Sequence, residues 1–125
     1  MNPRRTIAAV SGIYDALVGV MMLVGRPLLV QIFSVPPPVP PIHADLNGLF
    51  LLAVATGYLI PFRNPDSAEG RRYLWIMGPL LKGAGAVTFI LDYLLRGSPA
   101  SFLVFAASDG AVALLTLWAL MRTTR

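Results

Sequence analysis

The chain has 125 residues, of which 56% are hydrophobic and 13% are charged, and its mean hydropathy is +0.69. This composition excludes an ordinary soluble domain and is typical of a membrane protein. The net charge of +4 does not indicate a nucleic-acid-binding protein, because the basic residues do not gather on one polar face. The absence of cysteine from the sequence excludes disulfides, thiolate metal sites and redox dithiols.

Four apolar runs follow one another along the chain, and each is long enough to span a membrane. A helix that rises 1.5 Å per residue needs about 20 residues to cross about 30 Å of hydrocarbon. We therefore expect an all-α fold, a transmembrane four-helix bundle that forms one domain over residues 1–125. Its spans are predicted at about residues 7–24, 42–62, 73–95 and 101–121.

The connection between the first and second spans begins with Arg26 and Pro27 and contains the run "PPPVPP". Proline suits the first turn of a helix, so residues 28–33 are predicted to form a short interfacial helix. The prolines that follow favour a stiff polyproline II strap across the outer end of the bundle, and a ligand for proline-recognition modules is the less favoured interpretation. The short "GSPAS" turn predicts that the third and fourth spans form a hairpin, with Ser98 or Ser101 capping the fourth span.

Arginines are distributed unequally between the two ends of the predicted spans. Only two of them, Arg26 and Arg96, lie at the end that carries the proline-rich loop. The opposite end carries seven: Arg4, Arg5, Arg63, Arg71, Arg72, Arg122 and Arg125. The positive-inside rule therefore predicts that both termini lie in the cytoplasm.

One lysine and two aspartates fall near the middle of three predicted spans. Asp15, Lys82 and Asp109 lie among glycines and alanines at helical spacing, a pattern that marks faces where membrane helices approach closely. Because a lone charge at the bilayer centre costs about 2.5 to 3.5 kcal/mol, Lys82 is predicted to pair with Asp15, Asp109 or both. Tyr14 and Asn47 complete this predicted intramembrane polar cluster. The cluster either fixes helix pairing, which is the favoured interpretation, or binds a proton, an ion or a ligand.

A second polar cluster is predicted near the outer surface and consists of His43, Asp45, Asp92 and Arg96. One histidine and two acids without a motif are a weak indication of a metal site, so an interfacial network of salt bridges is favoured. The chain also has no paired-histidine motif, no phosphate-binding glycine loop and no serine with an evident histidine partner. We therefore predict no catalytic residue, metal or cofactor.

Several segments together resemble a known family. They are "YDALVG" in the first span, "NGLFLLAVATGY" in the second, "LLKGAGAV" in the third and "SDGAVALL" in the fourth. With the proline-containing outer loop, this outline resembles the small bacterial four-span membrane proteins of the DoxX-like kind over nearly the whole chain. The resemblance implies a four-helix bundle in the bacterial inner membrane. Some members associate with quinol-oxidising or sulfur-oxidising respiratory complexes, and the resemblance implies no catalytic residue.

Small loops and bulky apolar residues on the outer helix faces predict a non-catalytic accessory or scaffolding subunit of a larger bacterial membrane complex, respiratory, photosynthetic or otherwise quinone-linked. Its expected partners are the lipid bilayer and other membrane subunits, with lipid or quinone contact. The alternative is a small transporter, or a ligand- or proton-binding membrane protein, that uses Asp15, Lys82 and Asp109. A membrane enzyme with Asp15 or Asp109 as its general base is the least favoured function.

Overall fold

The computed structural model describes residues 2–34, 36 and 39–122. Within this part of the chain, four helical segments are long and apolar enough to cross a membrane: Pro3–Val24, Ile42–Arg63, Ala68–Arg96 and Ala100–Met121. No strand occurs among these residues. The predicted all-α, four-span architecture is therefore confirmed, and the fold is that of a multi-pass helical membrane protein.

The described helices follow the order of the predicted spans. The first two spans and their connection contain α1 (Pro3–Val24), α2 (Arg26–Phe33), α3 (Ile42–Gly57) and α4 (Leu59–Arg63). The last two spans contain α5 (Ala68–Trp75), the π-helix η1 (Ile76–Lys82), α6 (Gly83–Arg96), the 3-10 turn η2 (Ala100–Phe102) and α7 (Leu103–Met121). The short helix predicted over residues 28–33 is present as α2, whereas part of the predicted proline strap, including Pro37 and Pro38, lies outside the described residues.

Polar caps explain why the first and third spans begin before their apolar runs. The side chain of Asn2 accepts a hydrogen bond from the backbone N–H of Arg4, and Pro3 occupies the first helical turn. Ser67 similarly accepts a hydrogen bond from the N–H of Gly70 at the start of α5. Such caps satisfy backbone donors that a helix leaves free at its N-terminus, so the helices extend into polar sequence.

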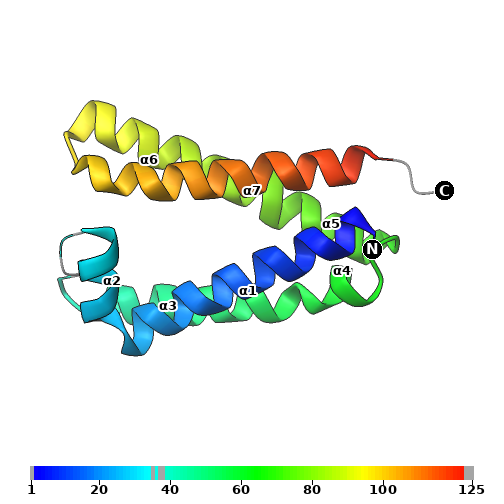
Figure 1. The fold of residues 1–125 in the computed structure, drawn as a ribbon, viewed down its shortest axis with the longest axis horizontal. Helices are drawn as coiled ribbons and strands as arrows, with labels where there is room; N and C mark the ends of the chain where they lie inside the picture. Colours follow the sequence, from blue (N-terminus) through cyan, green and yellow to red (C-terminus); the bar gives the residue numbers. More distant parts are fainter. Residues whose placement is uncertain (1, 35, 37–38, 123–125) are drawn as a thin grey trace.

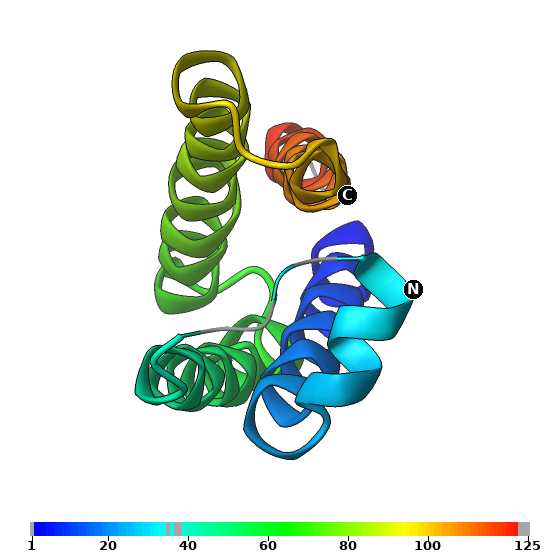
Figure 2. The same cartoon turned by 90° about the vertical axis from the view of Figure 1, so that its left-hand side faces the viewer.

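The four spans pack as two pairs (Figure 1). Helix α1 lies against α3 and α4, while α7 lies against η1 and α6, which confirms the predicted hairpin of the third and fourth spans. The two pairs meet where α1 contacts α7 and diverge toward the end that carries α2 (Figures 1 and 2). The predicted serine cap of the fourth span is wrong, because the Ser101 hydroxyl instead donates to the carbonyl oxygen of Ser34.

The main apolar core lies toward the end of the bundle that carries the two termini. Its members come from the beginning of α1, the end of the second span, α5 and the end of α7: Ile7, Ala8, Val54, Tyr58, Leu74, Ala119 and Leu120. Because the helix pairs diverge from this core, packing further along the bundle depends on other contacts. Small and polar residues at mid-span supply several of them.

Glycine allows close helix contact within each pair. A Cβ atom added to Gly48 of α3 would lie 2.9 Å from the carbonyl oxygen of Gly19 in α1. A Cβ atom added to Gly78 of η1 would lie 2.6 Å from Cγ2 of Thr116 in α7. Both positions are too close to the neighbouring helix for a larger side chain, as expected where small residues let membrane helices approach each other.

The π-helix η1 follows from a proline inside the third span. Pro79 has no backbone N–H, and in a regular α-helix its ring would clash with the carbonyl four residues earlier, that of Trp75. A locally wider π-helical turn begins at Ile76 and relieves this conflict without ending the span. The irregular segment ends at Lys82, so it sets the direction in which this lysine leaves the helix.

Candidate intramembrane polar site

Lys82 and Asp15 form a buried ion pair between the two helix pairs. The Nζ atom of Lys82 lies 2.7 Å from Oδ1 of Asp15, and the two side chains are 7% and 1% exposed. The backbone of η1 packs mainly on α7, so the long lysine side chain makes the connection to α1. The structure thus contains the predicted pairing of Lys82 with a carboxylate, and Asp15 is the partner.

Tyr14 and Ser108 form a second polar link beside this ion pair. The Tyr14 hydroxyl lies 2.8 Å from Oγ of Ser108, which joins α1 to α7. Since Ser108 donates its one hydroxyl proton to the carbonyl oxygen of Phe105, Tyr14 is the donor in the link between the helices. The Tyr14 ring also faces Lys82, whose Nζ lies 5.7 Å from the ring centroid. This ring therefore adds a weak attraction for the ammonium group.

Asp109 belongs to the same polar site but forms no ion pair of its own with any described residue. It is half-buried in α7, and no basic group among the described residues lies within ion-pair distance of its carboxylate. Its Oδ2 atom lies against α6, 3.4 Å from the position that a Cβ atom on Gly85 would occupy. The charges of Lys82 and Asp15 still act on it through space. The site thus contains one ammonium and two carboxylates, of which only Asp15 is directly paired.

Three oxygen atoms near the ion pair are buried without a hydrogen-bond partner among the described residues: Oδ2 of Asp15, Oγ of Ser11 and the hydroxyl of Tyr58. Ser11 and Asp15 are four residues apart and share one face of α1. Because an unpaired buried polar atom costs about 1 to 3 kcal/mol, these oxygens form a suitable environment for a bound water molecule or proton.

Asn47 does not belong to this site, and its predicted place in the intramembrane cluster is wrong. Its side chain is exposed on α3 and forms no hydrogen bond within the described part of the chain. The neighbouring residue Gly48 occupies the side of α3 that faces α1. Since adjacent residues of a helix point about 100° apart at 3.6 residues per turn, Asn47 is turned away from Asp15 and Lys82.

The predicted outer cluster is divided into two separate ion pairs. Arg26 of α2 pairs with Asp45 of α3, and Arg96 pairs with Asp92 within α6 at 3.4 Å. His43 is exposed, and no group of three histidine or acidic side chains in the described residues could hold a metal ion. His43, Asp45 and Asp92 are thus not gathered at one place, because α3 and α6 belong to helix pairs that diverge toward this end of the bundle.

Arg4 and Ser11 are buried polar residues that the sequence analysis missed. Arg4 is 5% exposed, and it donates hydrogen bonds to Oδ1 of Asp66 at 2.6 Å and to the carbonyl oxygen of Arg122 at 2.8 Å. Its position before an apolar run indicates only a cytoplasmic flank, and nothing in the sequence pattern indicates these partners. Ser11 gives a clearer signal, since it lies one helical turn before Asp15 on the same face.

No family model, curated protein or solved structure matches this chain. The resemblance to DoxX-like proteins remains a prediction, and any function assigned to the site depends on its geometry.

Proposed function

We propose that the protein is a non-catalytic accessory or scaffolding subunit that packs in the membrane against the helices of a larger bacterial complex. The observation that carries this proposal is that buried polar side chains connect the helices of this chain to one another, while the faces that point away from the bundle are apolar. The Lys82–Asp15 ion pair and the Tyr14–Ser108 hydrogen bond both connect helices of this chain to one another. The outer faces are instead apolar on all four spans, with exposed side chains that include Ile13, Leu17, Phe50, Leu80 and Leu114.

The short connections between spans support the same function. Residues 64–67 join α4 to α5, and residues 97–99 join α6 to η2. Connections of this size leave little chain for a soluble active site outside the membrane. The arginine excess beside the termini supports a cytoplasmic location for that end. The proposal of a quinone-linked complex of the bacterial inner membrane comes from the family resemblance alone.

Purification in native lipid particles without crosslinking tests the scaffolding function. We expect the tagged chain to migrate with at least one other membrane protein at a fixed ratio. Leu17→Asn on α1 and Leu114→Asn on α7 alter exposed residues of different helix pairs. We expect one of these variants to lose co-migration with the partner protein and the other to keep it. A folded chain that always migrates without a protein partner would contradict the proposal.

The surplus of carboxylates favours a second function, that of a proton- or cation-binding membrane protein or small transporter. One ammonium cannot neutralise both Asp15 and Asp109, so a bound proton or monovalent cation would balance the remaining negative charge. Flux into proteoliposomes tests this function, with Asp109→Asn as the variant and Asp92→Asn as the matched control. Loss of proton or sodium flux in Asp109→Asn alone supports transport, and flux no greater than in empty vesicles argues against it.

A further inference from the structure

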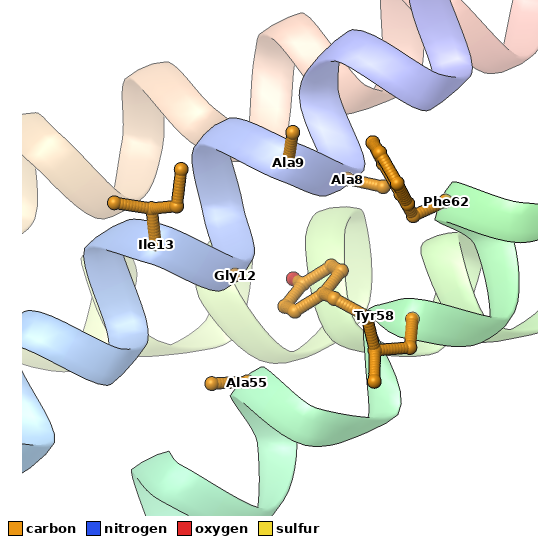
Figure 3. A pocket seen from close by; sticks show the side chains of 8 residues that line it. Ala8, Ala9, Gly12, Ile13, Ala55, Tyr58 and Phe62 are labelled. Atoms are coloured by element: carbon orange, nitrogen blue, oxygen red, sulfur yellow. The ribbon is translucent and has the colours of Figure 1, made fainter.

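A shallow apolar groove lies on the exterior of the helix bundle, between α1 and the span formed by α3 and α4 (Figure 3). Its volume is about 230 Å³. Ala8, Ala9 and Gly12 of α1 and Ala55 of α3 leave this space open, because none of them has a long side chain. The Tyr58 ring packs against Gly12 beneath the groove, where a Cβ atom on that glycine would lie 3.2 Å from Cβ of the tyrosine.

A basic group lies at the end of the groove that is nearer the chain termini. Phe62 lines this end, and the guanidinium carbon of Arg5 lies 5.9 Å from the centroid of its ring. Arg5 donates from Nε to the carbonyl oxygen of Phe62 at 2.9 Å and from Nη2 to that of Arg63 at 3.4 Å. An arginine has five N–H donors, so these two bonds hold the guanidinium over Phe62 while others remain available to a ligand.

The neighbouring charges make this end of the groove suitable for an anion. Asp66, an acidic side chain of the adjacent loop, pairs with Arg4 at 2.6 Å. Arg63 follows Phe62 directly in α4, and its side chain is exposed. The Arg5 guanidinium, which also reaches the backbone carbonyl of Arg63, therefore presents a positive charge at this end of the apolar groove.

We propose that the groove holds an acyl chain of an anionic phospholipid, whose phosphate contacts Arg5. The groove is smaller than the roughly 300 to 1,000 Å³ of sites for drug-sized ligands, and its shape and lining suit part of one hydrocarbon chain. Guanidinium groups bind phosphate through paired, charge-assisted hydrogen bonds, and basic pockets at the ends of membrane helices select anionic headgroups. A helix from another protein is the less suitable occupant, since it would have to bring an acidic group to this end.

Native mass spectrometry tests the headgroup contact on protein released from nanodiscs that contain equal amounts of phosphatidylglycerol and phosphatidylcholine. We expect the wild type to retain phosphatidylglycerol about fivefold or more over phosphatidylcholine. Arg5→Gln is expected to bring this ratio close to one. Arg71→Gln, which removes an exposed arginine of α5 that does not line the groove, is the matched control and is expected to keep the preference. Equal retention of both lipids by the wild type would overturn the proposal.

Filling the groove tests the acyl-chain contact. Ala9→Leu occupies the groove and is expected to lower retention of phosphatidylglycerol severalfold, whereas Ala53→Leu on an exposed part of α3 is expected to leave it unchanged. Unchanged retention in Ala9→Leu would show that the groove does not bind the lipid. If Ala9→Leu does not fold, a photoreactive amino acid in place of Ile13, which also lines the groove, is crosslinked in native membranes to identify the occupant. Lipid adducts support the proposal, and protein adducts without lipid adducts contradict it by placing a partner helix there.

Discussion

The Nζ atom of Lys82 lies 2.7 Å from Oδ1 of Asp15 and joins two helix pairs that diverge toward one end of the bundle. Both residues are buried, so each would be a lone charge in apolar surroundings without the other. The ion pair therefore couples the position of η1 to that of α1. This coupling leads to predictions that distinguish Lys82 and Asp15 from the other charged residues of the chain.

Lys82→Met is expected to lower the free energy of unfolding by about 3 to 5 kcal/mol, because it leaves the Asp15 carboxylate buried without a counter-charge. Titration of the purified protein from mild detergent into SDS, followed by circular dichroism, measures this change. Arg96→Met is the control, since it removes the basic member of an exposed pair and should cost no more than about 1 kcal/mol. Similar losses in the two variants would contradict a special role for Lys82.

Asp109→Asn and Asp15→Asn are expected to differ in their free energy of unfolding, although each removes one carboxylate from the same region. Asp15→Asn leaves Lys82 as an unpaired buried charge and should destabilise by about 3 to 5 kcal/mol. Asp109→Asn breaks no ion pair and should change the free energy of unfolding by no more than about 1 kcal/mol. The same SDS titration measures both variants. A larger loss in Asp109→Asn would identify Asp109, rather than Asp15, as the main partner of Lys82.

Gly78→Ala is expected to destabilise the third and fourth spans by about 1 to 3 kcal/mol, because its methyl group would overlap the Thr116 side chain. Gly83→Ala is a matched control in the same span, where the nearest atom, Cβ of Ala113, lies 4.0 Å from the added methyl group. The control should be neutral, or more stable by up to about 1 kcal/mol through its better helix propensity. Thermal unfolding in detergent measures both variants, and an unaffected Gly78→Ala would exclude the close packing of η1 on α7.

Arg4→Gln is expected to loosen the end of α7, because Arg4 connects Asp66 to the carbonyl oxygen of Arg122. Losing these charge-assisted hydrogen bonds should destabilise the protein by about 1.5 to 3 kcal/mol. Hydrogen exchange followed by mass spectrometry should show faster exchange in peptides that cover the last turns of α7. Arg72→Gln, at an exposed position of α5, should leave this exchange unchanged. Equal exchange rates in Arg4→Gln and the wild type would show that the link is not formed.

The spans, the short helix α2 and the hairpin of the last two spans were predictable because each depends on local sequence. An apolar run of sufficient length has few alternatives to a membrane helix, and a short turn joins antiparallel neighbours. The need to neutralise Lys82 also predicted a carboxylate partner from another span. These properties follow from composition and spacing without knowledge of how the helices are arranged.

The remaining details of the site depend on helix rotation and helix neighbours, which the sequence pattern does not determine. Gly48 and Asn47 are adjacent and point about 100° apart, so the rotation of α3 about its own axis decides which of them faces α1. The choice of Asp15 over Asp109 depends on the direction of Lys82 at the end of η1, after the irregular turn around Pro79. The two outer ion pairs are separate for a related reason, since they belong to different helix pairs.

The most direct test of the central ion pair is a double-mutant cycle with Lys82→Met and Asp15→Asn, in which SDS titration gives the free energy of unfolding of all four proteins. We expect the double variant to be more stable than either single variant, because no buried charge then remains unpaired. The resulting coupling energy should be at least about 3 kcal/mol, because it equals the sum of the two single losses minus the smaller loss of the double variant. Single losses that simply add in the double variant, with a coupling energy near zero, would show that the two side chains do not stabilise each other in the membrane.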